Sequence, residues 1–185
     1  MLDLKNITKE WTLFLDRDGV INVEKDMDYV YHYGEFFFYE GAKEALQFLS
    51  GHFKRIIIVT NQRGVGRSLM TEEALIDIHN QMLADVEASG GRINKVYYCT
   101  SIDNAHPNRK PNPGLFHEAL KDYPDIIASQ SLIVGNNLSD MEFGRNVGMH
   151  TVFVKTTSPQ QPLPHPLIDL AFNTLADFAK ALQQP

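Results

Sequence analysis

The chain has 185 residues, of which 43% are hydrophobic, and a formal net charge of −6 at pH 7. This length suits one domain that buries a core without disulfides, and the acidic balance disfavours a nucleic-acid surface, which needs clustered Lys and Arg. A single cysteine, Cys99, excludes an internal disulfide, and no apolar run approaches the roughly 20 residues of a membrane span.

We therefore expect residues 1–185 to form a single domain that binds neither nucleic acid nor membrane. The first ten residues, "MLDLKNITKE", alternate in charge and lack the apolar core of a signal peptide. A cytoplasmic location is the expectation that follows.

Short β-branched or apolar runs alternate with amphipathic segments along the chain. The first strand is expected in "WTLFLD" (11–16), followed by a helix over 41–50, a strand in "RIIIVTN" (55–61) and a helix over 71–89. Next come "KVYYCT" (95–100), a helix over 113–121, "SLIVGN" (131–136), a helix over 140–147, "TVFVK" (151–155), "LAF" (170–172) and a helix over 174–182. This alternation predicts an α/β fold, a three-layer, Rossmann-like, doubly wound parallel sheet.

The segment between Gly19 and Gly41 breaks the alternation, because it is rich in aromatic residues and lacks helical spacing. We expect a flap hairpin there, directly after the first strand, and no large cap domain. The prolines in "SIDNAHPNRKPNPG" exclude a helix until about Pro113.

Polar clusters follow the first four predicted strands: "DRDG", "TNQRGVGR", the loop ending in "RKP", and "GNNLSD". Ligands of open parallel sheets bind beyond the carboxyl ends of the strands, so these clusters are expected to converge. Asp16 and Asp18 would point to the same side, where two carboxylates require a cation or a shared proton between them. The alternative is that both aspartates merely end a strand in a turn at Gly19.

Four motifs, "FLDRDGVIN", "VTNQRGVGR", "RKPNPGLF" and "VGNNLSDMEFG", together resemble the haloacid dehalogenase (HAD) superfamily. The residues within these motifs are most similar to those of the histidinol-phosphate phosphatases and the D-glycero-D-manno-heptose 1,7-bisphosphate phosphatases. The similarity extends from Leu13 to Val154. The resemblance implies a Mg²⁺-dependent phosphatase that hydrolyses a small phosphomonoester, such as a heptose bisphosphate or histidinol phosphate.

The resemblance also implies roles for individual residues. Asp16 is the expected nucleophile, which forms an aspartyl-phosphate, and Asp18 is the expected general acid and then base. Thr60 and Lys110 complete the expected catalytic set by holding the phosphoryl group. Substrate contacts are expected from Asn61, Gln62, Arg63, Arg67 and Arg109, and Mg²⁺ ligation from Asp16, Asp18, Asn136 and Asp140.

Two departures from the family pattern stand out. Asn136 occupies the place of an aspartate that ligates Mg²⁺, and a neutral amide oxygen is a weaker ligand for that ion. The loop before "RKP" offers only Cys99 and His106, which cannot close a structural zinc site, so no zinc is expected.

Two other functions remain open on these residues. A catalytically weakened pseudoenzyme would bind a phosphorylated metabolite or partner at a metal site impaired by Asn136. A phosphomutase is disfavoured, because no insert is present that could shield an aspartyl-phosphate from water. The expected partner is a small phosphorylated metabolite, and the expected assembly is a monomer or weak homodimer.

Overall fold

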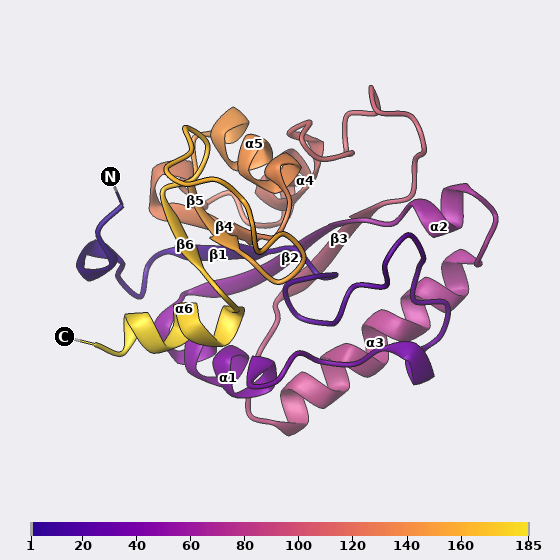
Figure 1. Ribbon diagram of the computed structural model, residues 1–185, viewed down its shortest axis with the longest axis horizontal. Coiled ribbons are helices and arrows are strands. Elements are labelled where there is room, and N and C mark those ends of the chain that lie inside the picture. Colours follow the sequence, from indigo (N-terminus) through magenta and orange to yellow (C-terminus); the bar gives the residue numbers. More distant parts are fainter. Residues whose placement is uncertain (1, 185) are drawn as a thin grey trace.

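The computed structural model describes residues 2–184, and its centre is a sheet of six strands in the order β3-β2-β1-β4-β5-β6 (Figure 1). Every pair of neighbouring strands is parallel. This is the strand order of a doubly wound fold, which confirms the predicted α/β class. The strands are β1 (Thr12–Leu15), β2 (Arg55–Asn61), β3 (Lys95–Cys99), β4 (Ser131–Gly135), β5 (His150–Val154) and β6 (Leu170–Phe172).

The five predicted helices form within two residues of their expected ends. They are α1 (Ala42–His52), α3 (Glu72–Ala88), α4 (Gly114–Asp122), α5 (Leu138–Val147) and α6 (Leu175–Leu182). Threonines cap the N-termini of α3 and α6. The Thr71 hydroxyl accepts a hydrogen bond from Ala74 N at 3.1 Å, and the Thr174 hydroxyl accepts one from Asp177 N at 3.1 Å. Capping explains why these helix starts could be predicted from sequence.

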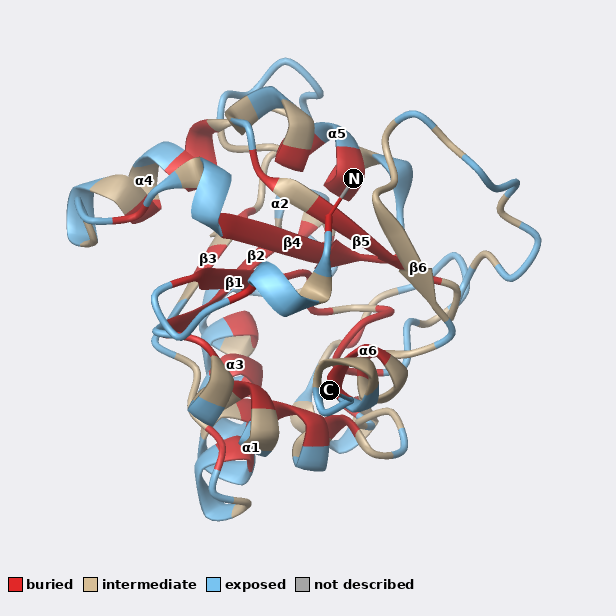
Figure 2. Ribbon diagram, turned by 90° about the vertical axis from the view of Figure 1, so that its left-hand side faces the viewer, coloured by how far each residue is buried: buried red, intermediate tan, exposed pale blue. Residues whose placement is uncertain are grey.

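Helices cover both faces of the sheet (Figure 2). Leu13 and Leu15 of β1 pack into a core with α1, α3 and α6, whereas Phe14 between them joins the opposite core with α4 and α5. All four residues of β1 are buried, which is the burial expected of a central parallel strand. Side chains that follow β1 can therefore reach solvent at the carboxyl ends of the strands, between the two helical layers.

The segment after β1 doubles back as the predicted flap, but it is a loop with little strand pairing. The chain doubles back, with Val23 N donating to Phe37 O at 2.8 Å, but the antiparallel pairing is limited to one bridge between Asn22 and Phe38. Glu35 holds the rest of the loop, because its carboxylate accepts from Lys25 Nζ and from Tyr31 N, both at 3.0 Å. Side-chain contacts thus replace the ladder that a hairpin would need.

One short helix, α2 (Arg63–Gly66), was not predicted, because its sequence "RGVG" reads as a glycine-rich turn. The close approach of another segment explains the last glycine. A Cβ atom on Gly66 would lie 2.1 Å from the backbone oxygen of Thr100. This position therefore requires glycine for space.

Among residues 2–184, no helix has the length and apolar character needed to cross a bilayer.

We predict that Gly66→Ala lowers the free energy of unfolding by about 1–3 kcal/mol, because the new methyl group overlaps the Thr100 carbonyl. Gly51→Ala is the matched control: it lies in α1 with no atom within 4 Å of the added Cβ, and it should stabilise the protein by up to about 1 kcal/mol. Urea denaturation of both variants measures the difference. Equal effects would contradict the steric explanation.

Candidate active site

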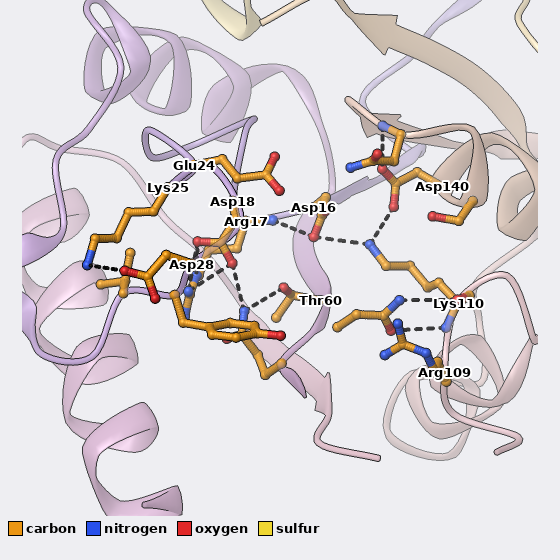
Figure 3. A pocket seen from close by; sticks show the side chains of 16 residues that line it. Asp16, Arg17, Asp18, Glu24, Lys25, Asp28, Thr60, Arg109, Lys110 and Asp140 are labelled. Carbon is orange, nitrogen blue, oxygen red and sulfur yellow. Dashed lines mark hydrogen bonds and ion pairs between the residues drawn. The ribbon is translucent and has the colours of Figure 1, made fainter. Parts of the chain in front are cut away.

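A cavity of about 270 Å³ lies beyond the carboxyl ends of β1, β2 and β4 (Figure 3). Strands β1 and β4 are neighbours whose connections leave in opposite directions along the sheet, and this is where open α/β sheets bind ligands. The four predicted polar clusters converge here. The residues that line the cavity include Asp16, Asp18, Thr60, Arg109, Lys110 and Asp140.

Asp16 directly follows β1, and its backbone N–H still donates to Val134 O of β4, at 3.0 Å. Its Oδ1 accepts from Arg17 N at 2.8 Å and lies 3.0 Å from Lys110 Nζ. Burial raises the pKa of Asp16, with further rises from the Asp140 and Asp18 carboxylates, and Lys110 offsets only part of this. The ionised carboxylate would therefore gain from an additional cation.

Lys110 is buried, and its Nζ also lies 2.6 Å from Asp140 Oδ1. Burial alone would lower the pKa of Lys110, but Asp140 and Asp16 outweigh it and raise the pKa. The other oxygen of Asp140 accepts from Asn137 N at 3.0 Å and so caps the start of α5. Both its oxygens are thus engaged, and Asp140 positions Lys110; the metal ligation expected of Asp140 stays a prediction.

Asn61 has a different task from the predicted substrate contact. Its Nδ2 donates to Lys110 O at 3.1 Å, and its Oδ1 accepts from Lys110 N at 3.1 Å. Both amide atoms are therefore used to fix the backbone of the loop that carries the lysine.

Thr60 and Gln62 lie at the end of β2, beside Asp18. Gln62 Nε2 donates to Asp18 Oδ2 at 2.8 Å and to Thr60 Oγ1 at 2.9 Å. Because Thr60 Oγ1 accepts this bond, its own hydroxyl hydrogen can donate to a phosphate oxygen in the cavity. Gln62 is buried and its Nε2 binds Asp18, and because Gln62 also lines the cavity its predicted substrate contact stays a prediction.

The three arginines predicted to contact substrate are placed differently. Arg109 lines the cavity, and its Nη1 donates to Ser101 O at 3.3 Å. Arg63 is bound to Asn104 and does not line the cavity. Arg67 lies outside as well, exposed, with its guanidinium 6.0 Å from the centre of the Tyr29 ring. Only Arg109 is thus placed to meet a ligand next to Asp16.

Sequence reasoning missed Arg17 and His79. The Arg17 side chain is 1% exposed, and its Nη2 donates to both oxygens of Asp18, at 2.8 and 2.9 Å. Its Nη1 lies 3.0 Å from His79 Nε2 on α3, which must accept because a guanidinium only donates. The signal for His79 was its place on the buried face of α3, among Leu75, Ile78, Met82 and Val86.

These contacts set the charge states around Asp18. Burial acts to raise the pKa of Asp18, but Arg17, assisted by Asn22 and Gln62, outweighs it and holds the pKa below its usual value. Burial, together with the charge of Arg17, lowers the pKa of His79 to about 3. At neutral pH the network is therefore a neutral imidazole, a guanidinium and a carboxylate.

A second missed contact involves the predicted metal ligand Asn136. This residue is fully buried, its Nδ2 donates to Glu24 Oε2 and to Thr157 Oγ1, both at 2.8 Å, and its Oδ1 has no hydrogen-bond partner. Local sequence patterns do not predict this pairing, since 112 residues separate Glu24 from Asn136.

The donor set fits Mg²⁺ only with help from groups other than carboxylates. Within residues 2–184, no three His, Cys, Asp or Glu side chains gather as a metal site of those residue types would require. Lys110 occupies the space between Asp16 and Asp140, and Arg17 engages the Asp18 carboxylate. The Asp16 carboxylate and the unpartnered Asn136 Oδ1 are hard oxygens of the type that Mg²⁺ binds, so they are the groups that would hold it.

Cys99 is buried, as predicted, and its sulfur lies 3.6 Å from His106 Nδ1. The expected absence of zinc stays a prediction.

Comparison with known proteins gives relatives over nearly the whole chain. A family model described as HAD-hydrolase-like matches residues 107–177. The D-glycero-alpha-D-manno-heptose-1,7-bisphosphate 7-phosphatase of Mycobacterium bovis is 34% identical over 174 residues, which cover 94% of this chain and 92% of the relative. The D-glycero-beta-D-manno-heptose-1,7-bisphosphate 7-phosphatase of Neisseria meningitidis is 33% identical, covering 93% of this chain and 94% of the relative.

A solved structure agrees with these relatives. The D,D-heptose 1,7-bisphosphate phosphatase of B. bronchiseptica, complexed with magnesium and phosphate, superposes with a TM-score of 0.84. It is 26% identical, and the match covers 94% of this chain and 98% of that one.

The chain thus belongs to the HAD superfamily of phosphatases, which confirms the resemblance of its four motifs. Within that superfamily its place is with the heptose-1,7-bisphosphate 7-phosphatases, and it is a phosphoric monoester hydrolase. Because the named relatives are phosphatases, the comparisons give no support to a pseudoenzyme.

We predict that His79 makes the protein acid-sensitive. Unfolding restores the usual histidine pKa near 6.5, so below that pH the unfolded chain binds more protons and stability falls until about pH 3. Between pH 8 and pH 5 this one group should cost about 2 kcal/mol of the free energy of unfolding.

His79→Gln should remove most of that loss, because a glutamine oxygen can still accept from Arg17. Urea denaturation at both pH values measures it, with His117→Gln, an exposed histidine on α4, as the control. An unchanged pH dependence in His79→Gln would show that the imidazole is not held neutral.

Proposed function

We propose that this chain is a Mg²⁺-dependent phosphatase that removes the 7-phosphate from a heptose 1,7-bisphosphate through an aspartyl-phosphate on Asp16. The observation that carries the proposal is the state of the Asp16 carboxylate. Its Oδ1 is held by Lys110 at 3.0 Å and by Arg17 N at 2.8 Å, whereas Oδ2 has no hydrogen-bond partner in the described chain. One oxygen is thus fixed, and the other is left for phosphorus.

The substrate class comes from the relatives. One relative is named for the alpha anomer of the sugar and is 34% identical, and another is named for the beta anomer and is 33% identical. Sequence identity therefore does not indicate which anomer this chain would use. Arg109 supports a phosphorylated ligand, because it brings a partly buried guanidinium to the cavity, and guanidinium groups bind phosphate oxygens in a fixed geometry.

In the first half of the reaction, Asp16 Oδ2 attacks phosphorus and the bond from phosphorus to the sugar oxygen breaks. Asp18 donates a proton to that oxygen as it leaves. In the free protein Arg17 keeps Asp18 ionised, but an arriving phosphate places negative charge beside it, which raises the pKa of Asp18. Lys110 and the Thr60 hydroxyl neutralise charge on the transferring group.

In the second half, Asp18 takes a proton from a water molecule that attacks the phosphorus of the aspartyl-phosphate. The bond to Asp16 then breaks, which releases inorganic phosphate and restores both aspartates. When bound, Mg²⁺ supplies positive charge to the phosphoryl oxygens and to the Asp16 carboxylate. Asp16 and Asn136 would hold it, and Asp18, whose carboxylate is paired with Arg17, would contribute its backbone carbonyl.

The single-domain organisation of residues 1–185, the cytoplasmic location and the monomeric or weakly dimeric state stay predictions.

We predict that the protein, with millimolar Mg²⁺, releases phosphate from a heptose 1,7-bisphosphate and leaves the 1-phosphate in place. Phosphate release and ³¹P NMR of the product measure the rate and the position, with both anomers and histidinol phosphate as parallel substrates. Asp16→Asn should lower the rate by at least about 10³-fold, because an amide cannot form the intermediate.

The control is Asp177→Asn, a change at the start of α6, remote from the cavity. No release from any of these substrates, with binding retained, would favour the pseudoenzyme instead.

A further inference from the structure

Asn136 stands where the family pattern has an aspartate, and the structure pairs it with a carboxylate from another segment. Asn136 Nδ2 lies 2.8 Å from Glu24 Oε2, and both residues meet at the carboxyl end of β4. A hydrogen bond from an amide to a carboxylate is charge-assisted, and so it is stronger than a neutral one. This contact joins the loop after β1 to the strand that carries the predicted metal ligand.

The contact fixes which end of the Asn136 amide is an acceptor. Nδ2 uses both its hydrogens, on Glu24 Oε2 and on Thr157 Oγ1, each at 2.8 Å. A flipped amide would set its oxygen against the Glu24 carboxylate, which cannot donate while it is ionised. Oδ1 is therefore committed to the other side, where it is buried and has no partner.

An unpartnered buried oxygen costs free energy, so Asn136 Oδ1 is expected to bind a partner, which is either water or a cation. The packing is close: a Cβ atom on Gly19, whose φ is +80°, would lie 2.9 Å from Asn136 Oδ1 and 2.1 Å from Nδ2. Gly19 thus leaves the space in which the amide sits, one residue beyond the Asp18 carboxylate.

Charge around the cavity gives a second, independent argument. Four carboxylates, Asp16, Asp18, Glu24 and Asp140, line the cavity together with three cations, Arg17, Arg109 and Lys110. The remaining charge is negative, which favours a bound cation. Lys25, which also lines the cavity, does not supply the balance, because it is paired with Glu35 at 3.0 Å and Asp28 at 3.4 Å.

Glu24 is placed to contribute one of those charges. Its carboxylate lies in the cavity on the side of Asp16 (Figure 3). The Asp18 and Asp140 carboxylates line the same cavity, and a nearby cation would relieve the repulsion among these charges.

From the contact, the orphaned oxygen and the charge balance, we propose that Glu24 and Asn136 together replace the family's single aspartate in binding Mg²⁺. Glu24 supplies the negative charge and holds the amide, and Asn136 presents Oδ1 to the ion. The inference rests on the proposed Mg²⁺-dependent function, and it adds a residue outside the four family motifs.

The test is titration of Mg²⁺ into the metal-free full-length chain by isothermal calorimetry, without substrate. Glu24→Gln keeps an oxygen that accepts from Asn136 but removes the charge, and it should weaken Mg²⁺ binding by about 10-fold or more. Asp26→Asn removes an exposed carboxylate two residues away and should change the affinity less than about twofold, since exposed charges are well screened.

The decisive variant moves the charge back to the family position. Glu24→Gln combined with Asn136→Asp should restore Mg²⁺ affinity to that of the unmodified chain or above it. Asn136→Asp alone sets two carboxylates against each other, so its metal-free melting temperature should fall and Mg²⁺ should raise it more than in the unmodified chain.

The outcomes separate this inference from the function on which it rests. If the unmodified chain binds Mg²⁺ and Glu24→Gln binds it equally well, the pairing is overturned and the phosphatase proposal stands. If Glu24→Gln is weakened but the double variant is not restored, the exchange of roles is overturned. If the unmodified chain binds no Mg²⁺, the metal dependence itself fails.

Discussion

The buried ammonium of Lys110 between the Asp16 and Asp140 carboxylates is the interaction on which the site depends. It ties together the end of β1, the loop after β3 and the first turn of α5, at 3.0 and 2.6 Å. Removing one partner of such a buried pair leaves an uncompensated charge, which costs about 3–5 kcal/mol. The same contact therefore holds three segments in place and keeps the Asp16 carboxylate oriented.

Around this contact, most polar side chains of the motifs form hydrogen bonds to other residues of the site. Asn61 binds both backbone polar atoms of Lys110, and Gln62 joins Asp18 to Thr60. A nucleophile and an acid must be held to a fraction of an ångström to react with phosphorus, and such supporting bonds provide that. Among the groups that line the cavity and could still meet a ligand are Asp16 Oδ2, the Thr60 hydroxyl and Arg109.

The two aspartates of the first motif are placed in opposite electrostatic surroundings. Burial and neighbouring carboxylates raise the pKa of Asp16, whereas the guanidinium of Arg17 keeps the pKa of Asp18 low. Arg17 is itself held by a neutral His79 from α3. His79 of α3 thus holds the guanidinium that keeps the pKa of Asp18 low, which links the packing of α3 to the cavity at the carboxyl ends of the strands.

Local periodicity and parallel-sheet topology were enough to predict the succession of strands and helices along the chain and the end of the sheet where polar residues gather. Four motifs were also enough to predict the superfamily and the positions of Asp16, Asp18 and Lys110. Tertiary structure alone decided that Asp140 engages Lys110, that Asn61 holds a loop, and that Arg63 and Arg67 lie outside the cavity. It likewise decided that His79 reaches Arg17 across 62 residues and Glu24 reaches Asn136 across 112. Such contacts depend on where segments that are far apart in the sequence meet in space, and local sequence patterns do not specify this placement.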